Sequence, residues 1–561
     1  MDDWMNSLYK FLLKHRFRLL ALSVFTAVFL IAVYPLFQDG LVFQPKIRDL
    51  DYHLLRIEGL KNELLLGNFP VYIHSLALYG YGYANSLFYP EVFLYIPAVL
   101  GILGLGITES YKIFVALITV FAILSSYLSS KYITKSRYAA LCFTVLFVLS
   151  QYRLSNVFLR AAVGEYCACL FIPIVAAGIY DLLYNNYKKP YILGLGFLGL
   201  ILTHSISFAI AGIITLVFLL FHIKYLFKNL YILIRLFYTG LAVALLTCFS
   251  WLPMIEQLIS DDFGINKPWA VLSKTAIPFQ TLFDFTYFAA MGLPLFVFIM
   301  IRMFISKQSE NTRKYFRLSD KFLITGIILA FMGTRLFPWT LLDGTVFNYI
   351  QFPWRLFAFA SMFLSLAVAI NMGILLKEKQ RIIALISVFI IMSVFAVVFL
   401  NPMIESKIHV EDDHYANYKN TGTIGAAEWI PLGTKKALLK DPYNALTENG
   451  EKILMQKNGS TVSFYNTSYA DDFYFDIPLL YYKGYSAFIT TEANKSYNLK
   501  IEKSPNNNLI RVYNPTNVSG EITVTYSGTS LQKISFYTSV FSLFLLLCCF
   551  VLYRKVRKKA P

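Results

Sequence analysis

Three side chains suited to acid–base or phosphate chemistry stand close together early in the chain. Within residues 46–70, KIRDLDYHLLRIEGLKNELLLGNFP, Asp49, His53 and Arg56 occupy positions i, i+4 and i+7, which share one face if the stretch is a helix. A carboxylate partly withdrawn from water has its charged form disfavoured, which moves its pKa towards neutrality and makes it a better general base. The pattern predicts a helix that carries such a base, Asp49, with Asp51 as its rival.

The same helix is predicted to lie flat on a membrane. Its neighbouring face is apolar, being made by Leu50, Leu54, Ile57 and Leu64, and an amphipathic helix of this kind rests at the lipid boundary with its apolar side down. Asp49 also has the position of a helix N-cap, and both roles can hold together. Taken singly, His53 and Arg56 are more often interfacial structural residues, but as part of this site both are assigned as candidate substrate contacts.

A second pair of charges, Arg160 and Glu165, lies in the segment LSNVFLRAAVGEY between two apolar runs. Charged side chains at membrane depth are costly, so they usually face a cavity or one another. We expect this pair to line a cavity, and a purely structural ion pair is the alternative.

A third candidate is Arg355, in FNYIQFPWRLFAFA, one turn into a helix that enters the membrane from outside. A cation is disfavoured at that end of a helix dipole and on that side of the membrane, so an anion should compensate it. A guanidinium grips phosphate through paired donors, which favours a lipid phosphate or diphosphate. Gln351 is assigned to the same site. Arg335, in the same outer loop, is either a second clamp or an interfacial anchor.

The remaining polar signals are weaker. His204, in LILTHSISFAIA, interrupts an apolar stretch. A single histidine there is more readily explained as a polar residue at a helix corner, with its hydrogen bonds satisfied by the protein, than as a ligand. We keep it as a candidate substrate contact. No second His or carboxylate stands at metal spacing, and no glycine loop could cradle a nucleotide phosphate. No metal ligand and no cofactor is therefore assigned, while a requirement for a divalent cation stays open.

The composition of the chain indicates the class of protein that positions these residues. The 561-residue chain is 57% hydrophobic and only 15% charged, with a formal net charge of +17. Such a chain is a polytopic α-helical membrane protein, and its positive surplus belongs to short loops beside membrane spans. The charge therefore favours contact with a lipid bilayer and argues against nucleic-acid binding.

Apolar runs near the length of about 20 residues that a crossing needs predict about 12 spans. They are placed at 17–37, 109–130, 138–155, 165–184, 190–205, 207–222, 231–252, 283–302, 321–337, 354–375, 381–400 and 534–553. The apolar run 87–106, in the first outer loop 38–108, is interpreted as re-entrant or half-buried. Counting it as a crossing would put the basic loops on the wrong side of the membrane.

Three regions follow from this pattern. Residues 1–402 form the membrane domain, 403–533 an extracytoplasmic β-rich domain, and 534–561 the last span with a basic tail. The β-rich region shows short alternating runs separated by Gly, Asn and Pro. Basic residues beside the first and last spans place both termini in the cytoplasm, and hence the chemical site and the β-rich domain outside the cell membrane.

Four motifs in this order, DLDYHLLRIEGLKNELLLGNFP, GYGYANSLFYPEVFLYIPA, YRLSNVFLRAAVGEY and IQFPWR, resemble one family. It comprises bacterial membrane proteins catalogued as related to pyruvoyl-tetrahydropterin synthase, with their YfhO-like cousins, within the GT-C superfamily of membrane glycosyltransferases. The resemblance covers about the first 400 residues. It implies a polyprenyl-phosphate-linked sugar as donor, and an acceptor that is a cell-envelope polymer, a lipid or a protein.

The resemblance also implies roles for matching positions. Asp49 corresponds to the first-loop acid that acts on the acceptor, and Arg355, with Arg160, would stabilise the departing lipid phosphate. Two departures stand out: Glu91 adds an acidic candidate, which we assign as a substrate contact, where a second Pro is usual, and Ala161 stands where Gly commonly follows the Arg. The rival interpretations are a lipid-linked saccharide transporter, or flippase, and a non-catalytic cell-envelope assembly factor.

Overall fold

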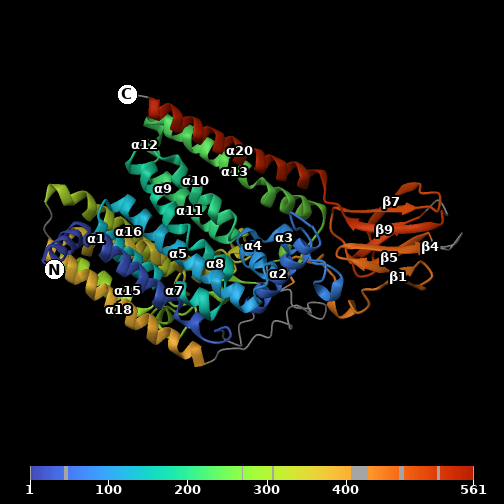
Figure 1. Cartoon of the computed structure of the whole chain (residues 1–561), viewed down its shortest axis with the longest axis horizontal. Helices are drawn as coiled ribbons and strands as arrows, with labels where there is room; N and C mark the ends of the chain where they lie inside the picture. The colour runs from blue at the N-terminus through green and yellow to red at the C-terminus, as the bar shows by residue number, and fades with distance from the viewer. Residues whose placement is uncertain are drawn as a thin grey trace. The chain divides into compact units, whose positions relative to one another are not determined.

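The computed structural model describes residues 2–42, 49–267, 270–305, 309–405, 427–466, 473–514 and 518–559. Its principal helices are α1 Asp2–Val33, α2 Asp49–Leu65, α4 Tyr95–Ile102, α5 Ile107–Thr134, α6 Arg137–Val148, α8 Val163–Ala168, α9 Ile172–Tyr184, α10 Pro190–Ile201, α11 Ser205–Phe221, α13 Leu230–Ser260, α16 Glu310–Met332, α17 Phe357–Ile370, α18 Glu378–Glu405 and α20 Ser530–Lys559 (Figure 1).

Within the described residues, seven helices are long and apolar enough to cross a membrane, or eight if the bent pair Arg137–Val148 and Gln151–Leu159 forms one span. The seven are Phe17–Phe37, Ile107–Thr134, Val163–Tyr184, Leu230–Ser260, Pro353–Leu375, Glu378–Glu405 and Ser530–Leu552. The multi-pass membrane class predicted from composition is confirmed, but the count of about 12 crossings is not.

Of the five predicted crossings that are not among the seven, 138–155 falls on the bent pair, 321–337 falls on α16, which is 23 residues long, and three contain short apolar helices. The segments predicted to cross at 190–205, 207–222 and 283–302 contain the helices Pro190–Ile201, Ser205–Phe221 and Leu293–Phe304, each shorter than the ~20 residues of a full crossing. Val92–Ile102, within the run 87–106 interpreted as re-entrant, is also a short apolar helix, and its re-entrant path stays a prediction.

The chain divides into two compact units. Unit 1 comprises residues 1–50, 112–239 and 269–410, and unit 2 comprises 51–111, 240–268 and 411–561. At the centre of unit 1, every residue of α17 is buried. In the same unit, α9 and α10 approach closely through glycines, because a Cβ atom on Gly178 would lie 2.5 Å from the Leu193 backbone. Such small-residue contacts are common between membrane helices.

Unit 2 contains the β-rich domain, whose described residues form nine strands that all lie within the region predicted from sequence. They are β1 Asn444–Thr447, β2 Lys452–Leu454, β3 Gln456–Asn458, β4 Thr461–Asn466, β5 Tyr474–Leu480, β6 Tyr485–Thr490, β7 Ser496–Lys503, β8 Leu509–Tyr513 and β9 Gly520–Tyr526. All pairings are antiparallel, in the order β2-β1-β5-β8-β7-β6-β9-β4-β3.

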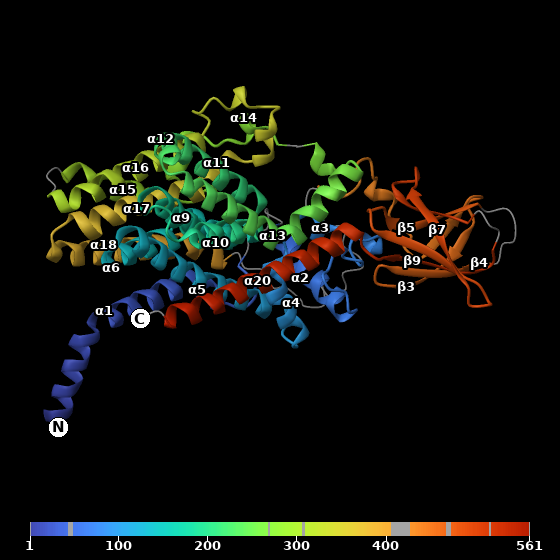
Figure 2. The same cartoon turned by 90° about the horizontal axis from the view of Figure 1, so that it is seen from above.

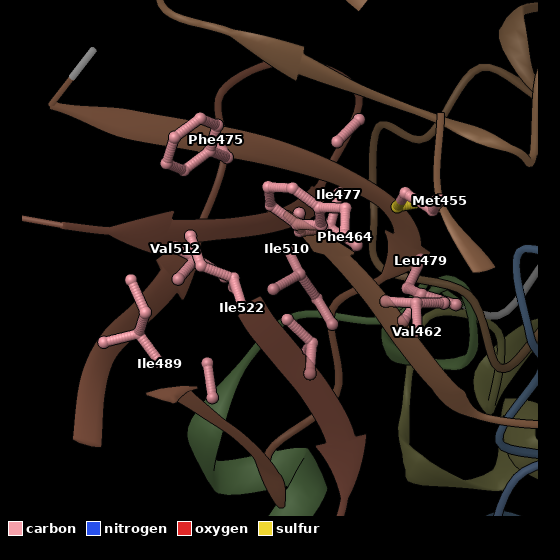
Figure 3. Close-up of a cluster of buried hydrophobic side chains, with 13 residues drawn as sticks. Met455, Val462, Phe464, Phe475, Ile477, Leu479, Ile489, Ile510, Val512 and Ile522 are labelled. Carbon is pink, nitrogen blue, oxygen red and sulfur yellow. The ribbon is translucent and has the colours of Figure 1, made fainter. Parts of the chain in front are cut away.

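The sheet folds over on itself to enclose one hydrophobic core (Figure 3). Phe464 of β4 and Phe475 of β5 meet edge to face with ring centroids 5.3 Å apart, although their strands are not neighbours in the sheet. The two halves therefore pack face to face, as in a sandwich. Inward-facing aliphatic residues fill the rest of the core: Val462, Ile477, Leu479, Ile489, Ile510, Val512, Ile522 and Val524.

The last helix, α20, follows the β-rich domain directly and runs beside the 240–260 part of α13, as Figure 1 and Figure 2 both show. The Cys248 thiol donates a hydrogen bond to the Ser535 carbonyl oxygen at 3.0 Å. Most of the apolar surface of both helices remains uncovered by protein, which is the surface expected of helices that face lipid.

Candidate active site

In unit 1, one carboxylate holds two arginines. Oε1 of Glu165, in α8, accepts hydrogen bonds from Nε of Arg355 at 2.9 Å and from Nη2 of Arg160 at 3.1 Å. Oε2 accepts from Nη1 of Arg160 and from the Tyr152 hydroxyl, both at 3.1 Å. We call Arg160, Glu165 and Arg355 the two-arginine cluster.

Arg160 is set by an irregular stretch of backbone. It follows a one-turn π-helix, Ser155–Leu159, a feature often found at functional sites. Its Nη1 also donates to Oδ1 of Asn156 at 2.6 Å, and its guanidinium lies 4.3 Å from the centre of the Trp354 ring. The next residue, Ala161, has a φ of +50°, a conformation that favours glycine. The alanine at this position therefore carries local backbone strain.

Arg355 is set by a second strained turn. Gln351 has φ +62° and ψ −48°, and the Phe352 amide donates to the Ile350 carbonyl at 2.7 Å, which closes a γ-turn of the strained kind. Nη1 of Arg355 donates to the Ile350 carbonyl at 2.7 Å and to Oε1 of Gln351 at 2.9 Å. Among the described residues, Nη2 of Arg355 has no hydrogen-bond partner. Strain of this kind tends to gather at functional sites.

Asp49, the first residue of α2, lies within electrostatic range of all three members of the two-arginine cluster. Its side chain keeps solvent-accessible surface, yet the surrounding protein raises the pKa of its carboxyl group, and the charge of Glu165 raises it further. Arg160 and Arg355 lower the pKa without cancelling the rise. An accessible carboxyl group with a raised pKa, beside two cations, is well suited to accept a proton.

His204 also lies within electrostatic range of Glu165, Arg160 and Arg355. Its Nδ1 accepts a hydrogen bond from the Ser207 amide at 3.2 Å and so caps the start of α11. That bond leaves Nε2 to carry the proton of a neutral ring. His204, predicted to be a polar residue with satisfied hydrogen bonds, is thus the N-cap of α11 and lies within electrostatic range of the two-arginine cluster.

Arg335 has hydrogen-bond partners that do not belong to the two-arginine cluster. Its Nε donates to the Ala276 carbonyl and its amide to the Ile277 carbonyl, both at 2.8 Å, and the side chain is exposed. These bonds tie two loops of unit 1 together. They favour the interpretation of Arg335 as an anchor over that of a second phosphate clamp.

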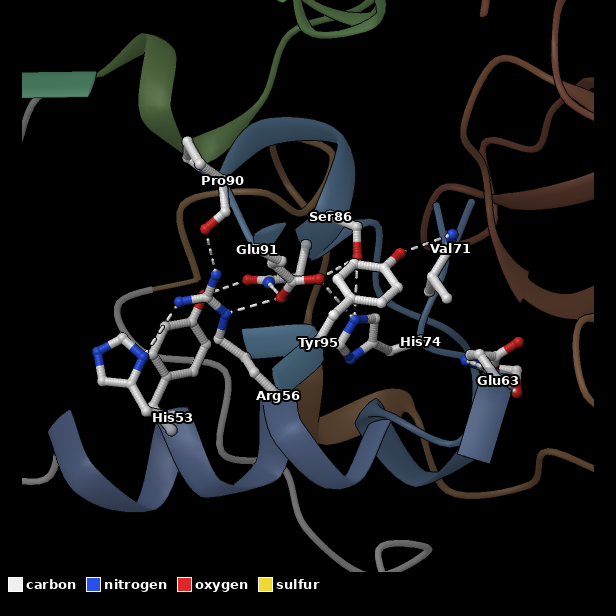
Figure 4. Close-up of polar contacts among 12 residues, drawn as sticks. His53, Arg56, Glu63, Val71, His74, Ser86, Pro90, Glu91 and Tyr95 are labelled. Atoms are coloured by element: carbon white, nitrogen blue, oxygen red, sulfur yellow. Dashed lines mark hydrogen bonds and ion pairs between the residues drawn. The ribbon is translucent and has the colours of Figure 1, made fainter. Parts of the chain in front are cut away.

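The other residues singled out on α2 belong to a separate group in unit 2, the first-loop cluster of Arg56, Glu91, His74 and His53 (Figure 4). Nε of Arg56 donates to Oε1 of Glu91 at 2.7 Å, its Nη1 lies 3.1 Å from Nδ1 of His53, and its Nη2 donates to the Pro90 carbonyl at 3.0 Å. Nε2 of His74 lies 3.1 Å from Oε2 of Glu91. The amide of Asn85 and the hydroxyl of Ser86 donate to the same carboxylate.

The first-loop cluster is sealed. Arg56 is 2% exposed and Glu91 6%. Burial alone would raise the pKa of Glu91, but the charges of His74 and Arg56 lower it to about 2. These contacts favour a structural role for Arg56 and Glu91, which the sequence had suggested as substrate contacts. His53 is buried with them, and Asp51, two residues earlier, is half-buried.

The structure corrects the expected setting of α2. The helix forms over Asp49–Leu65, but residues 53–60 are buried on every side, so it does not present one apolar face to lipid and one polar face to water. The reason is that its charged residues find protein partners: Arg56 binds Glu91, and Glu63 accepts a hydrogen bond from the Ser75 amide at 2.8 Å. Residues 43–48, which precede it, lie outside the described part of the chain.

Sequence reasoning missed three residues that hold the two-arginine cluster: Tyr152, Asn156 and Trp354. The first two lie in the quoted motif YRLSN and the third in FPWR, and each has an ordinary structural explanation when read alone. Only their common position around Arg160 reveals their role. No group of three or more His, Cys, Asp or Glu among the described residues is arranged to hold a metal ion.

No family model matches the chain. An uncharacterized protein of Lactococcus lactis subsp. cremoris (strain MG1363) is 24% identical over 314 residues, which are 52% of this chain and 50% of that protein. The chain thus matches about half the length of this relative.

Among solved structures, the arabinofuranosyltransferase AftD from Mycobacteria is similar with a TM-score of 0.41 and 12% identity, over 69% of this chain and 27% of AftD. The Archaeoglobus fulgidus oligosaccharyltransferase gives 0.40 and 14%, over 74% of this chain and 61% of that protein. A structure of AglB from the same organism with an inhibitory peptide and a dolichol-phosphate gives 0.35 and 13%, with the same coverage.

These three structures are of glycosyltransferases, the class that the sequence motifs indicated. The narrower likeness to YfhO-like proteins is not confirmed. TM-scores below 0.5 do not establish a common fold, so the functional conclusion rests on the site itself.

Proposed function

We propose that this chain is a membrane glycosyltransferase of GT-C type that moves a sugar from a polyprenyl-phosphate-linked donor to an extracytoplasmic acceptor. The observation that carries the proposal is the grouping of Asp49 with the two-arginine cluster. It brings an accessible base, whose pKa is raised, within electrostatic range of a guanidinium that has an unused donor.

The charges of the cluster suit a departing phosphate. Two arginines and one glutamate leave a net charge of 2 − 1 = +1, before Asp49 is counted. An anion that develops beside such an excess is stabilised, and the donors are already held in place. Glu165 positions both guanidinium groups. Arg355 then offers its Nη2 to the phosphate, and Arg160 offers the edge of its guanidinium that does not bind Glu165.

The proposed reaction is one displacement at the anomeric carbon of the donor sugar. The acceptor hydroxyl gives its proton to Asp49 as its oxygen bonds to the anomeric carbon. The bond between that carbon and the phosphate oxygen breaks, and its electron pair leaves with the polyprenyl phosphate. The released phosphate is stabilised by Arg355 and Arg160 and needs no proton.

The test is sugar transfer by the purified full-length chain in proteoliposomes, supplied with a panel of radiolabelled polyprenyl-phosphate sugars. We expect Asp49→Asn to lower the transfer rate by about 10²–10⁴-fold, the usual contribution of a general base. Asp51→Asn is the matched control and should retain activity. Undiminished transfer by Asp49→Asn would remove that residue from the mechanism, and loss in Asp51→Asn alone would move the base there.

The same vesicles separate the transferase from the transporter. A transporter moves the lipid-linked saccharide between leaflets without breaking its bond to phosphate, whereas a transferase releases polyprenyl phosphate. Translocation by the protein alone, with no release of polyprenyl phosphate for any donor in the panel, would overturn the proposed function. The placement of both termini in the cytoplasm and of the β-rich domain outside is part of the same proposal.

A further inference from the structure

A pocket of about 340 Å³ lies wholly within unit 2. Its walls come from three parts of the unit: the end of α2 with the loop that follows, the turns of the β-rich domain near Ser460 and Ser527, and the first turns of α20. Its volume is within the range of about 300–1,000 Å³ of small-molecule sites. The proposed chemistry takes place in unit 1 and does not use this pocket.

Aromatic rings form much of the wall: Phe69, Tyr72, Tyr526, Phe536 and Tyr537. Phe69 is 65% exposed and Tyr537 is 69% exposed, so both offer uncovered ring surface. Phe69 is fixed by edge-to-face contacts with Tyr95 and Phe536, whose ring centroids lie 5.9 and 6.0 Å away. Rigid exposed rings on a concave surface are costly in water and indicate a ligand with an apolar face.

The charges on the wall balance. The Glu63 carboxylate is buried and accepts hydrogen bonds from the Ser75 amide at 2.8 Å and from the Asn68 amide group at 2.7 Å. The Lys533 ammonium is exposed, and no described residue accepts a hydrogen bond from it. Glu63 would repel a phosphate group and Lys533 would repel a cation. Neither an anionic nor a cationic ligand therefore gains much binding energy from the charges of the wall. Neutral hydroxyl groups can both accept from Lys533 and donate to acidic oxygens.

We infer that this pocket binds a neutral oligosaccharide. A sugar ring has C–H faces that pack on aromatic rings and a rim of hydroxyl groups that bond to mixed donors and acceptors. The wall supplies both kinds of surface: the rings of Phe69 and Tyr537, and the polar groups of Ser460, Lys533 and Glu63. Because α20 is apolar from Ser530 to Leu552, the saccharide would bind at the boundary between water and lipid.

The test uses the full-length protein in lipid nanodiscs and an array of neutral oligosaccharides of two to four units, with affinities measured by calorimetry. We expect at least one to bind, and Phe69→Ala and Tyr537→Ala each to weaken it at least tenfold. Ser460→Trp keeps every aromatic residue and fills the pocket, so it should also abolish binding. The control is Tyr497→Ala, an exposed tyrosine of β7 that is not on the pocket wall.

Three results would overturn the inference: no binding by any neutral oligosaccharide, binding that Ser460→Trp leaves unchanged, or binding of phosphatidylglycerol nanodisc lipid that excludes the sugars. The inference is independent of the proposed function. An Asp49→Asn protein should bind the oligosaccharide with unchanged affinity although its transfer activity is lost, and a loss of binding in that variant would contradict a separate site.

Discussion

Among the described residues, two buried glutamates each bind arginine, and the two groups differ in the hydrogen-bond donors that they leave unused. In the first-loop cluster, Glu91 accepts from four side chains, and all three nitrogens of Arg56 have partners. In the two-arginine cluster, Arg355 keeps Nη2 without a partner among the described residues, and its side chain is 11% exposed. The comparison separates an arginine whose donors are all used within the protein from one that keeps a donor, which the proposed function assigns to a ligand.

The acids near the two clusters differ in the same way. The charges around Glu91 stabilise its ionised form and lower its pKa to about 2. Asp49 is accessible, yet its pKa is raised by the protein that surrounds it. A carboxylate with a lowered pKa contributes to stability, whereas one with a raised pKa reduces stability near neutral pH and gains basicity in return. Substitutions should therefore affect the two regions in opposite ways.

The largest effect on stability is expected for Glu91→Gln. It leaves the Arg56 guanidinium buried without its counter-charge, and breaking a buried ion pair in this way costs about 3–5 kcal/mol. The measurement is the melting temperature of the detergent-solubilised protein. Glu502→Gln, which removes an exposed pair with Lys500, should leave it unchanged. An unaltered melting temperature for Glu91→Gln would show that the first-loop cluster is not structural.

Arg355→Lys should chiefly affect catalysis. Lysine keeps the charge but cannot bind Glu165 and phosphate at once through a planar group. We expect transfer to fall about 10²–10³-fold, which is the usual loss on removing one donor to a developing anion, with little change in melting temperature. Arg335→Lys is the matched control and should retain activity. Full activity in Arg355→Lys would place the phosphate elsewhere.

The pH dependence of transfer should follow Asp49. A base must be ionised to act, so the rate is level at high pH and falls as pH drops through a midpoint above 3.8, the ordinary value for an aspartate. Because the pKa is raised in the folded protein, ionisation of Asp49 costs stability, and this cost is present above that midpoint. Asp49→Asn at pH 7 should therefore melt no lower than the native protein. A lower melting temperature would group Asp49 with Glu91 as a structural acid.

The smallest effect is expected for Ala161→Gly, beside Arg160. Glycine removes the strain of a positive φ, which should stabilise the protein by about 1 kcal/mol and leave transfer unchanged. Ala162→Gly is the control, because Ala162 has φ −77° and glycine there should only destabilise. If Ala161→Gly instead lowers transfer, the strain at that position helps to set Arg160.

The sequence could predict the residues of the site better than their pairing. Arg160, Glu165 and Arg355 were each recognisable as charges at membrane depth, but Glu165 and Arg355 are 190 positions apart in the chain. No periodicity links residues at that separation. The Arg56–Glu91 pair, 35 positions apart, was hidden for the same reason, and both residues therefore resembled substrate contacts.

The fold shows a similar limit. Alternation of apolar and polar residues sufficed to predict a β-rich domain after residue 403, but not the order of its strands, which depends on contacts between distant segments. Hydropathy identified the long spans, yet it could not distinguish them from shorter apolar helices such as α10, which has 12 residues. The strained turn at Gln351 had no sequence signal, because glutamine is not a residue that favours positive φ. At Ala161 the only signal was that glycine commonly stands at this position in the resembled family.

The position of β9 in the sheet has a consequence for biosynthesis. This strand pairs with both β4 and β6, and it is the last strand in the chain, ending at Tyr526 only a few residues before α20 begins at Ser530. Until it leaves the ribosome, the β3–β4 hairpin has no neighbour in the sheet and exposes a bare edge that is prone to aggregation. We therefore expect the sandwich to close only when α20 is about to be inserted, and nascent chains to be most exposed to quality control just before that moment.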